Sequence, residues 1–83
     1  MYYVYLLQSI DFQSQHYIGF TPDLKTRFKD HNEGKSKHTR KFKPWKIVCY
    51  LAFHSKQRAE EFEKYLKKGS GQAFLKKRFL EPC

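Results

Sequence analysis

Hydrophobic residues along the chain gather in short blocks that are separated by polar stretches. Residues 2–7 and 16–20 are rich in aromatic and β-branched residues, a composition typical of β-strands, and the polar residues 8–15 between them predict a hairpin. Residues 46–54 form the most apolar block and predict a third strand.

A helix is predicted to follow the hairpin. Thr21 suits the N-cap, Pro22 suits the first helical position, and Asp23 complements the positive end of the helix dipole. Gly34 is a good helix terminator, so we expect this helix to end close to it.

The last part of the chain predicts two more helices. Ser55 caps a helix expected over residues 56–68, the glycines within residues 69–71 interrupt it, and residues 72–80 form a short third helix. The resulting order, ββαβαα, predicts an α+β fold in which helices flank a small three-stranded sheet, mixed or antiparallel. A chain of 83 residues has no room for a second hydrophobic core, so we expect residues 1–83 to form a single domain.

The chain is strongly basic, with 17 Lys and Arg against 8 Asp and Glu and a formal net charge of +9. A protein of this charge attracts polyanions, and nucleic acid is the expected partner. Binding to an anionic membrane would require a basic amphipathic anchor or a lipidation signal, and the sequence shows neither. It also contains no apolar stretch of membrane-spanning length.

The two cysteines have no partner at the spacing of a metal site or a redox motif. Cys49 lies in an apolar run and is expected to be a buried structural thiol, and Cys83 is a thiol in the C-terminal tail. Met1 leads directly into the first strand without the features of a signal peptide. We therefore expect a reducing, cytoplasmic location.

The hairpin could bring two phenols together. Alternation along the first strand places Tyr3, Tyr5 and Leu7 on one face, and Tyr17 and Gly19 share a face of the second strand. If the sheet lays Tyr5 beside Tyr17, the two phenols converge next to a glycine that leaves room for a ligand. Tyrosines also favour strands simply as packing residues, and that alternative stays open.

The first helix carries two polar side chains on its inward stripe. Leu24 and Phe28 mark this stripe, and Arg27 and His31, also four residues apart, fall within it. Two such groups next to a face with two tyrosines favour a functional site. The alternatives are an arginine that extends to solvent and a histidine that is satisfied within the core.

The second helix supplies a candidate metal ligand. Its apolar stripe consists of Ala59, Phe62, Tyr65 and Leu66. At about 100° per residue, Glu63 lies at the edge of that stripe, whereas Glu60 and Glu61 lie further round the helix. Glu63 is therefore the carboxylate best placed to hold a hard divalent cation. The alternative is a surface ion pair with Lys67, four residues further on.

The segment between the first helix and the third strand is cationic. Its basic residues are candidate nucleic-acid contacts: Lys35, Lys37, Arg40, Lys41, Lys43 and Lys46. Phe42 and Trp45 lie among them, a combination suited to phosphate contact plus base stacking. Residues 76–78 extend the basic surface. A run of charge is also common as an ordinary solvated surface.

In sequence order these residues resemble the GIY-YIG nucleases. Tyr3-Val4-Tyr5, followed after eleven residues by Tyr17-Ile18-Gly19, is similar to the two-part signature of that family, with Tyr3 in place of the first glycine. The remaining elements follow in family order: Thr21-Pro22-Asp23-Leu24 leading to Arg27, then His31-Asn32, His38-Thr39-Arg40, Pro44-Trp45, and Ala59 with Glu63 and Lys67. The resemblance covers nearly the whole chain. It is strongest to the small bacterial single-domain members, similar to the incision module of bacterial excision-repair nucleases.

This resemblance implies a metal-dependent endonuclease that hydrolyses nucleic-acid phosphodiesters. The expected substrate is DNA, in repair or structure-selective cleavage. By the match, Tyr5 and Tyr17 are the catalytic tyrosines, and Arg27 and His31 are the catalytic arginine and histidine. Glu63 is the ligand of one Mg²⁺ or Mn²⁺ ion. The base that deprotonates the water is left open between Tyr5 acting directly and His31 acting as a relay.

One element of the family pattern is missing. Many members carry an asparagine after the glutamate helix, and this chain has none beyond Asn32, with Gln72 as the nearest amide. The departure supports an alternative function, a nucleic-acid-binding module on the same fold without turnover. A structural or protein-interaction domain whose charge serves solubility is a third class. A protein partner that supplies specificity is compatible with so small a chain.

Overall fold

The computed structural model describes residues 1–80 of the chain. Its elements are β1 (Tyr2–Ser9), β2 (His16–Thr21), α1 (Leu24–Glu33), a 3₁₀ turn η1 (Arg40–Phe42), β3 (Trp45–Phe53), α2 (Lys56–Lys67), α3 (Gly69–Leu75) and a π-type turn η2 (Lys76–Leu80). The predicted order ββαβαα and the α+β class are confirmed.

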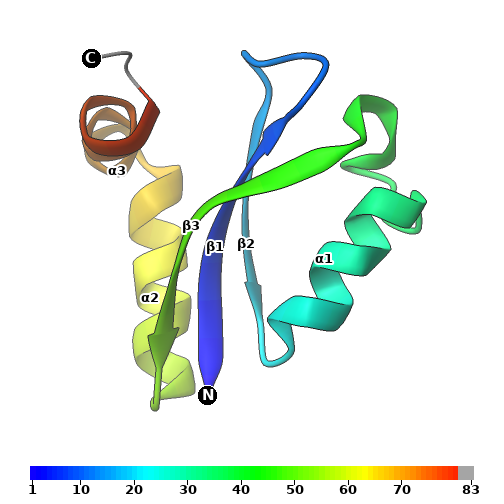
Figure 1. Ribbon diagram of the computed structural model, residues 1–83. Coiled ribbons are helices and arrows are strands. Elements are labelled where there is room, and N and C mark those ends of the chain that lie inside the picture. The colour runs from blue at the N-terminus through cyan, green and yellow to red at the C-terminus, as the bar shows by residue number, and fades with distance from the viewer. Residues whose placement is uncertain (81–83) are drawn as a thin grey trace.

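The three strands form one antiparallel sheet in the order β2-β1-β3. Strand β1 is therefore central and pairs with both neighbours. Helix α1 lies on one side of the sheet, and α2 and α3 lie on the other (Figure 1). No helix within residues 1–80 combines the length and the apolar composition that a membrane crossing needs.

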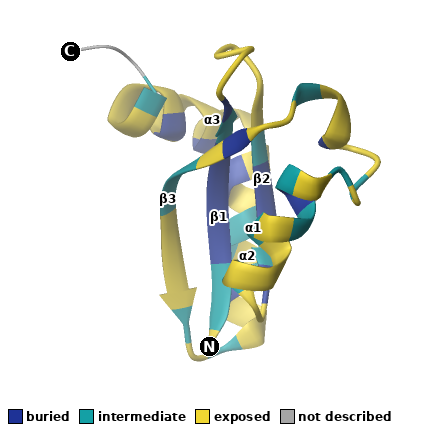
Figure 2. Cartoon of the chain, turned by 45° about the vertical axis from the view of Figure 1, so that its right-hand side comes forward, coloured by how far each residue is buried: buried dark blue, intermediate teal, exposed yellow. Residues whose placement is uncertain are grey.

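Alternation along β1 divides the apolar interior into two clusters. The α2-side cluster has Val4, Leu6, Ile18, Ala59, Leu66 and Leu75 as its buried members. The α1-side cluster has Tyr5, Leu7 and Trp45, with Tyr17, Leu24 and Phe28 among the half-buried residues packed against it. Figure 2 shows β1 as the buried centre between these layers, while the outward surface of α1 is exposed. The predicted facing of both hairpin strands is confirmed.

Strand β3 contains a bulge that changes its facing. Leu6 pairs with Cys49 and Leu7 pairs with Ile47, so Val48 is the extra residue. Val48 and Cys49 both pack against the α2-side cluster, and Ile47 packs on the α1 side. Cys49 is a half-buried free thiol whose pKa is raised by burial. The thiol of Cys83 lies outside the described residues.

The start of α1 differs from the prediction. Asp23, not Thr21, is the N-cap, because its side chain accepts a hydrogen bond from the Thr26 amide. The Thr21 hydroxyl instead accepts from the Asp23 amide at 3.1 Å, so Pro22 precedes the helix and does not open it. The predicted terminator is confirmed, since Gly34 follows the helix with a left-handed φ of 79°.

The C-terminal helices also differ in detail. Ser55 caps α2 as expected, by accepting from the Arg58 amide. The break after α2 falls at Lys68, whose ψ is 168°, and residues 69–71 form the first turn of α3 instead of a linker. On α2 the prediction for Tyr65 was wrong, because this ring is 42% exposed. Ala59 and Leu66 define the buried edge of the helix instead.

Gly19 permits a close approach between the hairpin strands. It is the register partner of Tyr5, and a Cβ atom at Gly19 would collide with the Tyr5 ring and hydroxyl. The Tyr5 side chain therefore lies across β2 at the one position where no side chain blocks it. A larger residue here would displace a fully buried ring.

We expect Gly19→Ala to lower the free energy of unfolding by about 1–3 kcal/mol, because the new methyl group overpacks the Tyr5 ring. Urea denaturation of the purified variant measures this loss. Gly69→Ala is the matched control, since nothing lies within 4 Å of a Cβ atom at Gly69. Equal stabilities of the two variants would contradict the proposed contact.

Candidate active site

A chain of buried hydrogen bonds links the hairpin, α1 and the segment before β3. The Tyr5 hydroxyl lies 2.8 Å from His31 Nε2, and His31 Nδ1 lies 2.7 Å from the Thr39 hydroxyl. All three residues are at most 1% exposed. The polar groups are thus removed from water and satisfy one another, as buried polar groups must.

Tyr17 adds a second phenol to this group. Its ring centroid lies 5.0 Å from the His31 ring and 6.3 Å from the Tyr5 ring. Leu7, not Tyr5, is the direct register partner of Tyr17, so the two tyrosines meet diagonally across the hairpin. The convergence of phenols on the α1 side of the sheet, predicted from facing, is confirmed.

A second set of hydrogen bonds holds Thr39 in place. The Trp45 indole N–H donates to the Thr39 carbonyl at 2.8 Å. The Asn32 amide group accepts from the Trp45 backbone N–H at 2.6 Å and donates to the Trp45 carbonyl at 3.2 Å. The start of β3 is therefore fastened to the end of α1, next to His31.

Sequence reasoning gave Thr39 and Asn32 no role. Both lie within the ordered family elements, which is the only signal that could have singled them out. Their partners are set by the fold, since the Thr39 hydroxyl reaches a side chain eight residues away and Asn32 reaches backbone 13 residues away.

Electrostatics keep the two central groups neutral. Burial is the main cause that raises the pKa of Tyr5 well above its ordinary value, with Tyr17 and Glu63 adding to the rise and Arg27 opposing it. Burial also lowers the pKa of His31, and the Arg27 guanidinium lowers it further while Asp30 opposes. A protonated phenol and an uncharged imidazole follow at neutral pH.

Arg27 does not lie on the inward stripe of α1, so that prediction was wrong. The residue is exposed, although its charge acts on both Tyr5 and His31. At 100° per residue, roughly, Arg27 lies 40° from His31 around the helix. The guanidinium therefore borders the phenol–imidazole pair from the solvent side.

Glu63 approaches the same phenol from α2. Its carboxylate contributes to the raised pKa of Tyr5, and its side chain is 21% exposed, against 42% for Glu60. The ion pair with Lys67, weighed as the alternative role, is present at 3.3 Å. The Lys67 ammonium group contacts the Oε2 atom of Glu63.

The donor set fits a hard cation with few protein ligands. Within residues 1–80, no three His, Cys, Asp or Glu side chains gather closely enough to enclose a metal ion. Glu63 is therefore not part of such a cluster. Mg²⁺ and Mn²⁺ suit such a ligand, since Mg²⁺ keeps several waters and takes one or two carboxylates plus substrate phosphates.

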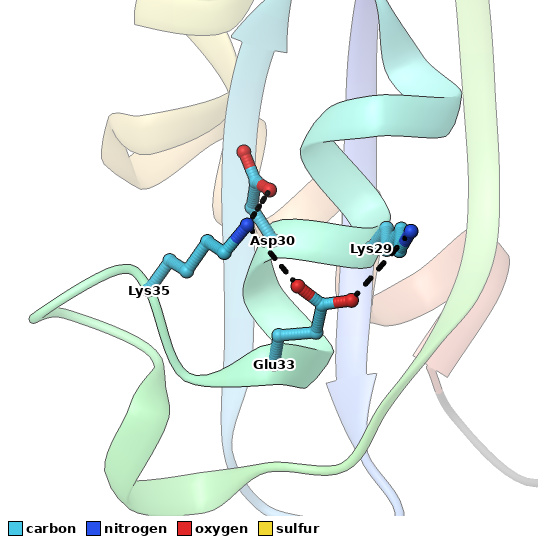
Figure 3. A network of polar contacts seen from close by, with 4 residues as sticks. All are labelled: Lys29, Asp30, Glu33 and Lys35. Carbon is cyan, nitrogen blue, oxygen red and sulfur yellow. Dashed lines mark ion pairs between the residues drawn. The ribbon is translucent and has the colours of Figure 1, made fainter.

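The six basic candidates between α1 and β3 are all exposed, as nucleic-acid contact requires: Lys35, Lys37, Arg40, Lys41, Lys43 and Lys46. Lys35 differs from the others, because its ammonium group pairs with Glu33 at 3.2 Å and with Asp30 at 3.6 Å (Figure 3). Lys29 contacts the second oxygen of Glu33. Much of the Lys35 charge is therefore already compensated.

The aromatic part of that prediction was wrong for Trp45. Its side chain is 3% exposed and belongs to the α1-side cluster, so it has no face open for base stacking. Phe42 is half-buried and packs edge-to-face on Phe12 at 5.4 Å between ring centroids. Gln72, the amide nearest the missing asparagine, donates to the Leu66 carbonyl and so caps α2.

Comparison with known protein families gives one match over nearly the whole chain. Residues 1–78 match the family described as the GIY-YIG catalytic domain. A UPF0213 protein of Streptococcus agalactiae is 40% identical over 74 residues, which cover 88% of this chain and 82% of the relative. A UPF0213 protein of Streptococcus pyogenes is 40% identical over 67 residues, covering 80% and 71%.

A solved structure is similar over the full chain. The solution NMR structure of a UPF0213 protein from Bacillus halodurans superposes with a TM-score of 0.57 and 34% sequence identity, and covers 99% of this chain and 89% of that one. The sequence and the fold thus point to the same relatives.

The buried imidazole makes stability depend on pH. Burial lowers the pKa of His31, and of the less buried His16, below the value of 6.5 that the unfolded chain has. Below that pH the unfolded chain binds protons that the folded chain does not. The free energy of unfolding is therefore highest above this pH and decreases as the pH falls. We expect urea midpoints to decline between about pH 7.5 and pH 5.5, with up to ~1.4 kcal/mol per pH unit from His31.

His31→Gln should flatten this decline, because it removes the titrating group. An unchanged slope in the variant would show that His31 is not held neutral by the fold.

Proposed function

The chain belongs to the GIY-YIG family, a family of nucleases, and from this premise we propose that it is a metal-dependent endonuclease that hydrolyses phosphodiester bonds in DNA. The observation that supports this most directly is the convergence of Tyr5, Tyr17 and His31, which lie on three separate elements, within one hydrogen-bonded and stacked group. We propose a cytoplasmic role in repair or structure-selective cleavage.

Each charged or polar group has a role that its chemistry supports. Arg27, exposed beside the phenol, offers several N–H donors to the negative charge that develops on the phosphate. Tyr17 orients the phosphate or the attacking water. Tyr5 handles the proton of that water, and His31 is the titratable group in direct hydrogen-bond contact with Tyr5.

Glu63 is the proposed ligand of one Mg²⁺ or Mn²⁺ ion. When bound, such an ion neutralises charge on the scissile phosphate and its leaving oxygen. The ion pair with Lys67, made through the Oε2 atom, would help to orient the Glu63 carboxylate. The high pKa of Tyr5 adds a reason for cationic partners at this site, because positive charge favours the phenolate.

The exposed cations between α1 and β3 are proposed to hold the nucleic-acid backbone. Residues 76–78, also exposed, extend that surface from the C-terminal side. Contacts of this kind bind phosphates without reading sequence. A protein partner is therefore our proposed source of substrate specificity.

One observation favours a second candidate, a nucleic-acid-binding module without turnover. The Gln72 amide is engaged with the Leu66 carbonyl, so it does not replace the absent asparagine. Binding that survives EDTA, with no cleavage of any substrate under Mn²⁺, would favour this candidate.

We expect Tyr17→Phe, Arg27→Ala and Glu63→Gln each to reduce cleavage by at least about a hundredfold, because each removes a group that contacts the reacting phosphate, water or metal. The measurement is a Mg²⁺- and Mn²⁺-dependent assay over single-stranded, duplex, flap and Holliday-junction substrates.

Glu60→Gln is the matched control for the metal ligand. It lies on the same helix, is twice as exposed and pairs with Lys56 in the same i,i+4 arrangement. We expect it to retain activity. Full activity in purified Glu63→Gln would remove the metal assignment.

Binding should weaken steeply with salt, because cations that neutralise phosphates release condensed counterions. We expect Lys37→Gln to reduce the slope of log affinity against log salt by about one. Lys35→Gln should change it less, because Lys35 already pairs with Asp30 and Glu33. Equal effects of the two variants in a fluorescence-anisotropy titration would argue against this difference.

A further inference from the structure

The row Tyr5–His31–Thr39 contains one hydrogen more than it has hydrogen bonds. The phenol, the uncharged imidazole and the threonine hydroxyl each bring one polar hydrogen, and only two bonds join them. Within residues 1–80, neither hydroxyl has another hydrogen-bond partner. One hydrogen must therefore lie at an end of the row.

Two arrangements satisfy this count. In the first, Tyr5 donates to Nε2 and the imidazole Nδ1–H donates to Thr39, which leaves the threonine hydrogen unused. In the second, Thr39 donates to Nδ1 and the imidazole Nε2–H donates to the Tyr5 oxygen, which leaves the phenol hydrogen unused. The two differ in the tautomer of His31 and, with it, in which hydroxyl donates to the ring.

The surroundings of the two ends favour the second arrangement. Thr39 is completely buried, and its carbonyl oxygen already accepts a hydrogen bond from the Trp45 indole. If the hydroxyl hydrogen of Thr39 did not point to His31, it would have no acceptor. The Tyr5 oxygen borders the half-buried Tyr17 and lies within the field of the Glu63 carboxylate. A hydrogen at that end points toward the half-buried Tyr17, the more open side of this group. Nε2–H is also the intrinsically preferred tautomer of a histidine side chain.

We propose that Thr39 is a positioning residue that donates to His31 Nδ1 and thereby holds the imidazole as the Nε2–H tautomer, a hydrogen-bond donor to Tyr5. For its effect on cleavage this inference rests on the proposed nuclease function. His31 then does not receive the Tyr5 proton. It donates to the Tyr5 oxygen whether that group is a phenol or a phenolate, and the hydrogen or the lone pair that faces the substrate belongs to Tyr5.

The tautomer can be read directly from ¹⁵N-labelled protein by long-range ¹H–¹⁵N correlation of the His31 ring, at about pH 8, where the imidazole is uncharged. We expect Nε2 to be the protonated nitrogen and Nδ1 to show the shift of a hydrogen-bonded acceptor. A wild-type protein with protonated Nδ1 would overturn the proposal. This readout needs no cleavage, so it decides the tautomer even if the nuclease function fails.

Substitution of Thr39 tests the coupling to Tyr5. Thr39→Val should move the Nδ1 resonance toward that of a nitrogen without a donor, and lower kcat about tenfold with KM unchanged. Thr39→Ser keeps the hydroxyl and should restore both readouts. Thr26→Val is the matched control, because Thr26 is exposed on α1 and its hydrogen-bonding partner is the N-cap Asp23, not His31.

Failure of the serine variant to restore the Nδ1 resonance, in a protein whose melting temperature matches the wild type, would contradict the donor role. An unchanged Nδ1 resonance in Thr39→Val would also contradict it. If Thr39→Val does not fold, the wild-type spectrum and Thr39→Ser still decide between the two arrangements.

Discussion

The hydrogen bond between Tyr5 and His31 is the constraint on which the rest of the structure depends. It joins the central strand to α1 through the middle of an otherwise apolar cluster. An unpaired phenol or imidazole at this depth costs more than the bond itself contributes, so the helix is held at one position over the sheet. Gly19 serves the same bond, because only a residue without a side chain lets the phenol extend across β2.

The two sides of the sheet bury different kinds of residues. On the α2 side the fully buried residues are aliphatic, and their burial contributes hydrophobic stabilisation. On the α1 side, polar groups occupy space that a small domain would otherwise fill with apolar side chains. The hydrogen-bonded polar groups thus lie on one face of β1 and the aliphatic cluster on the other. Glu63 lies on α2, and its charge nevertheless acts on the Tyr5 phenol of the α1-side cluster.

The sequence predicted most of the fold because its signals are local. Strand alternation places Tyr5 and Tyr17 on a common face, and the signature elements single out His31. The failures have a common cause. Trp45 sits among cations in the sequence yet is buried by contacts with residues distant along the chain, and Arg27 is rotated away from the stripe by a small angular difference that periodicity does not resolve. Contacts of this kind depend on tertiary packing and cannot be inferred from spacing alone.

Both clusters contain residues of β1, and this affects how the protein unfolds. Loss of the helices on either side uncovers one face of β1, the strand that both clusters share, so opening on one side weakens the packing of the whole sheet. The protein should therefore behave as one cooperative unit. The residues of the candidate site then come together only when the whole domain folds. No subset of its helices and strands holds them in place on its own.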